Sequence, residues 1–560
     1  MGFQLSPGVN VSEIDLTTVV PSVLTTAGAF AGTFKWGPAN KVMLIDSEIS
    51  LSKTFGTPDS NSAVSFFTSA NFLSYGNNLS VVRVVGANAF NSSANSNARM
   101  QVVNSDEFEY TMLSQNNGNA YGPFIARYPG ALGNSLSVVV IDTGNTARSD
   151  LFSSAPGTSE YATNVGGAND EIHIAVVDSG GLFSGFKNTV LETFAFVSKA
   201  SNAVKVNDGS TNYYKQVIFN SSKYIYAVDP PDYSNTLSTW GKTADTSFAS
   251  ITPKSITYSL QSGADEIPSD GEVIAGFNLF SNKETTDISL LLTGGANTNI
   301  QQSVMDIART RADCVAFVSP PSDSVINNSG SESADILSWA DSLTPSSYTV
   351  ADSGWKYQFD VYNNVYRWIP LNGDIAGLCV YTDTMRDPWY SPAGFNRGQI
   401  KNAIKLAWNP SKTYRDALYS KGINPVASFS GQGVVLFGDK TLQNKPSAFD
   451  RINVRRLFIV LEKAIARAAQ FSLFEFNDEF TRAQFVALVS PYLRDVQGRR
   501  GITDFKVVCD ETNNTAQVID SNQFVGDIYI KPARSINFIQ LNFVAVGTGV
   551  DFLTVVGAAQ

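Results

Sequence analysis

The chain has 560 residues, of which 43% are hydrophobic, 11% aromatic and 16% charged; this composition is typical of a globular protein with several domains and excludes wholesale disorder. Its net charge of −10 argues against nucleic acid as the main partner, because phosphate binding needs clustered lysine and arginine. The three cysteines lie far apart and indicate neither a disulfide framework nor a metal knuckle, and no apolar run is long enough to predict membrane insertion.

Residues 1–20 predict an extended N-terminal arm. The run SPGVNVSEID, residues 6–15, opens with Pro-Gly and continues with β-forming residues, and a proline at position 21 ends it. A short, isolated strand of this kind can complete a sheet in a neighbouring subunit. We therefore expect an inter-subunit contact through Pro7, Gly8, Val9, Val11 and Ile14.

Residues 21–90 predict the first part of an α/β core. An apolar strand pattern covers residues 25–34, and a helical pattern covers 60–76. The β-branched run LSVVRVVGA at 79–87 is typical of a buried central strand. Strand, helix and strand in this order indicate a βαβ-like unit.

Residues 91–268 differ from the flanking segments in composition and periodicity. Residues 91–118 are rich in Asn and Ser with little periodicity, which indicates a short flexible insertion. From 119 to 268, short alternating patterns between Gly-, Ser-, Asn- and Pro-containing turns predict a separate β-rich outer domain. The only histidine, His173, lies in the alternating run EIHIAVV, which favours a half-buried strand position over catalysis or metal binding.

Residues 269–525 alternate again between helix and strand, which predicts an α/β sheet covered by helices and gives the chain a mixed α/β, multidomain fold class. Helical patterns cover 270–281, 299–311 and 331–343, with apolar strands between them.

The last third of the chain predicts two long helices and then strands. The longest helix is expected over 449–471 and a second over 478–493, followed by strands at 504–509, 526–530 and 536–546. Residues 526–560 are expected to form C-terminal strands and a linker arm. Alternating apolar residues in this segment favour pairing within the same subunit, with pairing to a neighbour as the alternative: Ile539, Leu541 and Phe543.

No catalytic or nucleotide-binding motif is complete. The segment WGKT at 240–243 has Thr236 where a phosphate loop needs glycine. The segment GQGVVLFG at 431–438 has Leu436 in place of the third glycine of a dinucleotide fingerprint, which favours a hairpin strand. With one histidine and no metal-ligand spacing, we expect no enzyme activity and no catalytic, cofactor or metal site.

The helix expected over 449–471 carries a basic stripe, defined here as Arg456, Lys463 and Arg467. These residues fall within about 40° of one another, opposite the apolar face. Residues 451–500 hold nine Lys or Arg against five Asp or Glu. The stripe is either an ordinary solvated face or a docking face for an acidic partner protein, and the neighbouring Val460 leaves open packing against another domain.

Several segments resemble the tail sheath proteins of contractile-tailed bacteriophages, most closely the T4-like group. They are SPGVNVSEID at 6–15, AGTFKWGPA at 31–39, VVRVV at 81–85, SPAGFNRGQI at 391–400, INPV at 423–426, FGDKT at 437–441, FDRINVRRLF at 449–458, VVCDETNNT at 507–515 and IYIKPARSINFIQLNFVAV at 528–546. The similarity covers residues 1–90 and 270–555, and the family's outermost inserted domain is shortened here to residues 91–118.

The resemblance implies a structural subunit that needs no cofactor. Such subunits form hexameric rings stacked helically around a tail tube, and their terminal arms add strands to neighbouring subunits' sheets. Contraction drives the tube through the host envelope. The implied partners are further copies of the chain, the tail tube protein, and baseplate and tail terminator proteins, without direct nucleic acid contact. The implied location is the virion, after assembly in the host cytoplasm. On this basis we expect the basic stripe, Arg456, Lys463 and Arg467, to face the tube.

Two alternatives remain at this point. One is the sheath of a tailocin or another contractile injection system, which shares the C-terminal motifs. The other is an α/β hydrolase or nucleotide-binding enzyme, against which the missing phosphate loop and the lone His173 argue.

Overall fold

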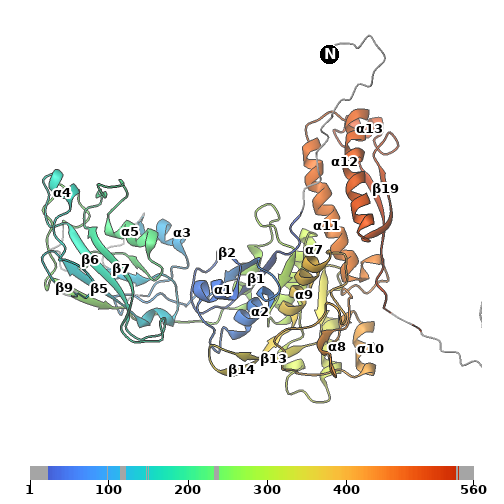
Figure 1. Cartoon of the computed structure of the whole chain (residues 1–560), viewed down its shortest axis with the longest axis horizontal. Helices are drawn as coiled ribbons and strands as arrows, with labels where there is room; N and C mark the ends of the chain where they lie inside the picture. The colour runs from blue at the N-terminus through green and yellow to red at the C-terminus, as the bar shows by residue number, and fades with distance from the viewer. Residues whose placement is uncertain are drawn as a thin grey trace, which may run out of the picture. The chain divides into compact units, whose positions relative to one another are not determined.

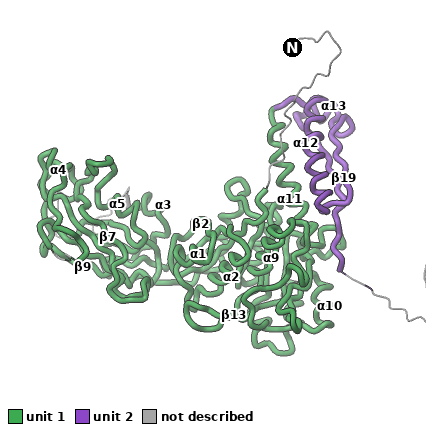
Figure 2. Tube along the Cα trace, in the orientation of Figure 1, with its two compact units in different colours: residues 1–474 green, residues 475–560 purple. Residues whose placement is uncertain are grey.

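The computed structural model describes residues 23–97, 99–113, 121–146, 148, 150–231, 239–537 and 540. The chain divides into two compact units, unit 1 (Met1–Phe474) and unit 2 (Glu475–Gln560), coloured separately in Figure 2. Several predicted arm residues lie outside the described residues, and their roles stay predictions: Pro7, Gly8, Val9, Val11, Ile14, Ile539, Leu541 and Phe543.

A seven-stranded sheet forms the centre of unit 1 (Figure 1), with the strand order β16-β12-β11-β10-β1-β3-β2. All neighbouring strands are parallel except β2 and β3. Pairing of β1 with β3, with helices between them in sequence, confirms the βαβ-like unit. The strands are β1 (Gly28–Gly32), β2 (Val42–Ile45), β3 (Leu79–Arg83), β10 (Leu290–Leu292), β11 (Val315–Val318), β12 (Thr349–Asp352) and β16 (Ile423–Asn424).

Helices and two smaller sheets pack around this sheet. The helices are α1 (Glu48–Phe55), α2 (Ala63–Leu73), α6 (Asp270–Asn278), α7 (Thr298–Arg311), α8 (Glu332–Ser342), α9 (Asn372–Met385), α10 (Lys412–Ser420) and α11 (Ile452–Ala469). Four of them confirm the helices predicted at 60–76, 270–281, 299–311 and 331–343. The smaller sheets contain β13 (Trp355–Asp360), β14 (Val365–Pro370) and β15 (Lys405–Leu406), and β17 (Val426–Phe429) and β18 (Gly433–Leu436). The β17-β18 hairpin confirms the interpretation of GQGVVLFG.

Residues 119–268 have a sheet of their own and a hydrophobic core that also includes Trp36. They belong to the same compact unit as the rest of residues 1–474. Four antiparallel strands follow the order β7-β6-β5-β9, beside a β4-β8 pair. The elements in and before this region are α3 (Ser105–Phe108), β4 (Phe124–Ala126), β5 (Leu136–Asp142), α4 (Glu160–Asn164), β6 (Glu171–Asp178), β7 (Thr189–Ser198), α5 (Tyr214–Ser221), β8 (Ile225–Ala227) and β9 (Ser255–Ser259).

His173 is a structural residue on β6. It is 1% exposed, and its Nδ1 accepts a hydrogen bond from the amide of Phe196 at 3.0 Å. Its Nε2 lies 2.9 Å from the carbonyl oxygen of Ser154, to which it donates. Both ring nitrogens are therefore hydrogen-bonded, and the strand position predicted for His173 is confirmed.

Close packing of α9 on α2 depends on Gly373. A Cβ atom at this position would lie 2.5 Å from the carbonyl oxygen of Thr68 on α2. We expect Gly373→Ala to destabilise the protein by about 1–3 kcal/mol in urea unfolding, because the helices must separate. The control is Gly271→Ala on α6, where a Cβ would meet nothing within 4 Å, so that stability stays equal or rises by up to about 1 kcal/mol.

Unit 2 contains α12 (Glu479–Gly498), β19 (Ile502–Val508), α13 (Ala516–Asp520) and β20 (Asp527–Pro532). With 20 residues, α12 is longer than α11 with 18, so the prediction that the longest helix lies at 449–471 is wrong. The predicted end at residue 493 is also too early, because α12 continues through Pro491. Its buried residues Val489, Leu493 and Val496 share one face, and burial of this face outweighs the hydrogen bond that proline removes.

The boundary between the units falls inside the segment 269–525, which the sequence predicted as one core. Among the residues of the predicted strand 536–546, those at 536, 537 and 540 are described and lie outside any strand.

Candidate assembly surfaces

The basic stripe of α11 packs within unit 1. Arg456 is 4% exposed, and its guanidinium donates two hydrogen bonds to the carboxylate of Asp383 on α9, at 2.7 and 2.6 Å. A buried guanidinium paired within the same chain does not present its charge to a tube. Arg456 therefore does not lie on a solvated face, which argues against the tube contact that stays a prediction for it.

The other two residues of the stripe share Asp287, which precedes β10. Lys463 Nζ donates to Asp287 at 3.0 Å and to the carbonyl oxygen of Ile288 at 2.7 Å, and Arg467 also pairs with Asp287. Burial alone would raise the pKa of Asp287, but Lys463 and Arg467 outweigh it and lower this pKa. The Lys463 side chain is 10% exposed, which argues against its expected tube contact, and that contact also stays a prediction. Arg467 is 40% exposed, and its tube contact remains a prediction.

The same face of α11 contacts the segment that follows the predicted N-terminal arm. A narrow cleft is lined by Val23, Leu24 and Thr25 and by residues of α11, including Val460. Arg456 donates to the carbonyl oxygen of Thr25 at 3.4 Å, and Val460 is 8% exposed. This face therefore packs against residues of the same unit and not against another domain, the alternative that Val460 left open.

In unit 2, β19 and β20 form a two-stranded antiparallel sheet. Its register runs from Ile502 opposite Pro532 to Val508 opposite Asp527. Within the described part of the chain no third strand joins it. A two-stranded sheet is only marginally stable alone, and its open edges are templates for further strands. The sheet therefore has two edges at which an arm can pair.

The motif VVCDETNNT positions this sheet. The amide of Asn514 donates to the carbonyl oxygen of Val525 at 2.8 Å, and its oxygen accepts from the Val525 amide at 2.9 Å. Asn513 donates to the carbonyl oxygen of Val508 at 2.9 Å. The next residue, Gly526, packs closely on α12, because a Cβ at this position would lie 2.8 Å from the ring of Phe485. The motif thus fixes the loop that joins the two strands.

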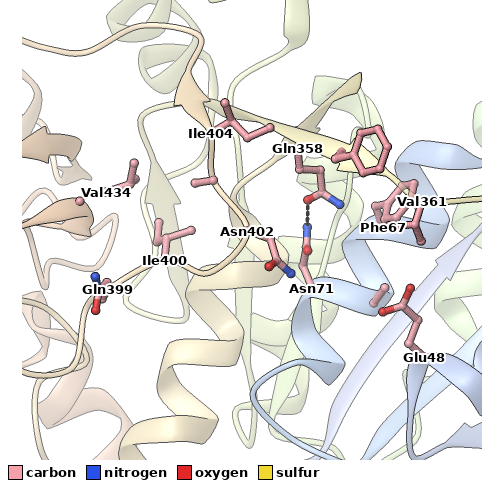
Figure 3. Close-up of a pocket in the computed structure, with 14 residues that line it drawn as sticks. Glu48, Phe67, Asn71, Gln358, Val361, Gln399, Ile400, Asn402, Ile404 and Val434 are labelled. Carbon is pink, nitrogen blue, oxygen red and sulfur yellow. Dashed lines mark hydrogen bonds between the residues drawn. The ribbon is translucent and has the colours of Figure 1, made fainter. Parts of the chain in front are cut away.

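Unit 1 contains a cavity of about 570 Å³ (Figure 3). Asn71 donates to Gln358 at 2.8 Å in its wall. Its single carboxylate, Glu48, accepts from the hydroxyl of Tyr362 at 3.0 Å. Its lining residues include no histidine, cysteine or lysine, so it offers no nucleophile with an adjacent base.

The carboxyl edge of the parallel sheet, where α/β enzymes bind ligands, is filled by side chains. Asp352 and Ser319 lie 2.6 Å apart, and Asn372 donates to Ser319 at 2.9 Å and to the carbonyl oxygen of Gly294 at 2.8 Å. These three side chains are buried, and burial raises the pKa of Asp352 to about 8. At the carboxyl ends of β10, β11 and β12 these side chains are thus hydrogen-bonded to one another and to the backbone.

Among the described residues, no group of three or more His, Cys, Asp or Glu is placed to hold a metal ion. In this part of the chain there is also no helix of the length and apolarity that crossing a membrane requires.

Comparison with solved structures identifies the fold. A crystal structure of a sheath tail protein from Listeria innocua superposes with a TM-score of 0.53 at 10% identity, covering 90% of this chain and 94% of that one. A contracted sheath complex of an extracellular contractile injection system gives a TM-score of 0.51 at 14% identity, covering 97% and 98%. The mixed α/β fold is therefore that of sheath proteins.

Sequence comparison identifies the family. Residues 25–84 match the N-terminal region of tail sheath protein Gp18 domain III, residues 275–442 the phage tail sheath central domain, and residues 444–545 the phage tail sheath C-terminal domain. The tail sheath protein of Vibrio phage KVP40 is 35% identical, covering 99% of this chain and all of that protein. The tail sheath protein of Enterobacteria phage T4 is 31% identical, covering 99% of each. The resemblance noted in the sequence is confirmed, and the chain belongs to the tail sheath protein family of contractile-tailed phages.

Proposed function

We propose that this sheath subunit polymerises as stacked hexameric rings around a tail tube and contracts to drive the tube through the host envelope. The observation that carries the proposal is the full-length relationship to a phage tail sheath protein, at 35% identity over 99% of this chain. Its partners would be further copies of the chain, the tail tube protein, and baseplate and tail terminator proteins. The protein would assemble in the host cytoplasm and remain in the virion tail.

The open β19-β20 sheet supports assembly by strand addition. Both edges of this sheet are unpaired within the described residues of unit 2, which suits two incoming strands, and the predicted N-terminal arm is one candidate. The C-terminal segment with Ile539, Leu541 and Phe543 is the other, either from the same subunit or from a neighbour.

Contraction in this proposal needs no catalytic residue. A subunit held in a metastable lattice releases stored free energy when its interfaces repack. If each subunit gains a few kcal/mol, a tail of a hundred or more subunits gains hundreds of kcal/mol.

The β-rich segment 119–268 is proposed to face outward, away from the strands that link subunits. The alignment with the KVP40 protein extends over 680 positions, 120 more than the 560 residues of this chain. Insertions in the relative therefore have no counterpart here. Shortening of the outermost domain to residues 91–118 is our proposal for one of them.

A phage sheath is favoured over the sheath of a tailocin or another injection system, because the full-length relatives above 30% identity come from phages. Negative-stain electron microscopy of the purified full-length protein tests the proposal. We expect helical tubes of stacked rings, and protein that stays monomeric at every concentration and in the presence of tail tubes would contradict it.

A further inference from the structure

We propose that unit 2 carries two complementary ends through which copies of this chain contact one another head to tail. The inference rests on the proposed function, because it names a contact within the polymer. One end is acidic and aromatic and lies at the start of α12; the other is basic and lies at the end of α12.

The acidic end combines exposed rings with exposed carboxylates. Phe476 is 84% exposed and Phe480 is 74% exposed, although aromatic rings of this size are normally covered. Asn477 donates to the carbonyl oxygen of Gln523 at 2.8 Å, which brings the loop after β19 and the helix α13 to the same end. The exposed carboxylates of the acidic end are Glu475, Asp478, Glu479, Asp510, Glu511 and Asp520.

The basic end combines α12 with the end of β20. Ala533 donates its amide hydrogen to the carbonyl oxygen of Gly501 at 3.1 Å, which places the residues after β20 beside the C-terminus of α12. Its exposed cations are Arg494, Arg499, Arg500, Lys531 and Arg534. Arg499 pairs with Asp495 and Lys531 with Asp504. Arg494 and Arg500 form no ion pair with any residue in the described ranges.

The two ends lie too far apart to neutralise each other within one copy. A helix of 20 residues is about 30 Å long, whereas salt screens charges beyond about 8–10 Å. Between two copies the ends match, since carboxylates meet guanidinium groups and the same guanidinium groups can lie over phenylalanine rings.

The complementary charges of the acidic and basic ends therefore favour a second copy of the chain as the binding partner. Because the two ends are different surfaces, the contact is heterologous, and repetition of a heterologous contact builds rings or open helical filaments. A sheath of stacked rings requires contacts of this kind.

Two charge-reversed variants of the full-length chain test the inference. Glu475→Lys with Glu479→Lys, Glu511→Lys and Asp520→Lys leaves two carboxylates beside four lysines, so that both ends are basic. Arg494→Glu with Arg500→Glu leaves three cations beside two new glutamates, Asp495 and Asp504, so that both ends are acidic. We expect each variant alone to raise the critical concentration for polymerisation at least about tenfold, because like charges then meet. An equimolar mixture is expected to return to within about twofold of wild type, since a basic end of one variant again meets an acidic end of the other. Pelleting and electron microscopy measure both effects.

Lys187→Glu with Lys205→Glu is the matched control. It changes the net charge as much as the double arginine variant, at exposed positions of the 119–268 segment, and is expected to polymerise as wild type does. Wild-type polymerisation by both reversed variants would overturn the inference, as would a mixture no better than its components. Loss confined to assembly on tail tubes would assign these ends to the tube protein and also overturn it. A wild-type chain that forms no tubes would instead contradict the proposed function.

Discussion

Replacing Arg456 by alanine is expected to reduce the free energy of unfolding of unit 1 by about 3–5 kcal/mol. The substitution leaves Asp383, whose side chain is 4% exposed, as a buried charge without its partner. It also removes the donor to the carbonyl oxygen of Thr25, at the start of the described chain. Both losses act on the contact between α11 and the rest of unit 1.

Arg467→Ala is the matched control, because Arg467 lies on the same helix face and also pairs with an aspartate. Its side chain is 40% exposed, so the loss is expected to be about 0–1 kcal/mol. Urea unfolding followed by circular dichroism compares the two variants. Arg456→Met with Asp383→Leu, which removes both charges, is expected to recover most of the loss. Equal small losses for Arg456→Ala and Arg467→Ala would contradict the buried ion pair.

Local features of this molecule could be predicted from sequence because their causes lie within a few residues. The apolar period of 3.6 residues in α11 and the β-branched run of β3 fixed the type of each element. The end of α12 could not be predicted in the same way. Pro491 is a local stop signal, and burial of Val489 and Leu493 against the rest of unit 2 outweighs it.

The environment of the basic stripe could not be predicted, because its partners are distant in sequence. Asp383 lies 73 residues from Arg456, and Asp287 lies 176 residues from Lys463. A helical wheel shows which residues share a face but not what that face contacts. The one local signal was Val460, whose apolar side chain among the cations indicated packing.

The motifs behind the family resemblance have structural causes where the structure describes them. Asn514 in VVCDETNNT forms two hydrogen bonds with Val525 that hold the ends of β19 and β20 in register. A residue in this role can be recognised from a family pattern, but its partner is visible only in the fold.

Deleting residues 1–20 is expected to leave a folded, soluble monomer that no longer polymerises. The described core of unit 1 is built from residues at and beyond Ala29, so the deletion removes no part of that core. It does remove the strand that we expect to pair with the open β19-β20 sheet of a neighbour. Circular dichroism and sedimentation measure folding and assembly, and sheaths of normal length from the shortened chain would show that the arm is not a linker.

A smaller change, which keeps the full length of the chain, tests whether the arm acts by strand pairing. Val9→Pro with Val11→Pro removes two backbone N–H donors from the predicted strand, and proline is not tolerated where such donors pair within a sheet. We expect this variant to remain monomeric, as the deletion does. Val9→Thr with Val11→Thr keeps both donors and β-branched side chains, and is expected to polymerise. For strand pairing, the proline and threonine variants differ in their backbone N–H donors. If the proline variant polymerises as well as the threonine variant, the arm acts through side-chain contacts and not as an added strand.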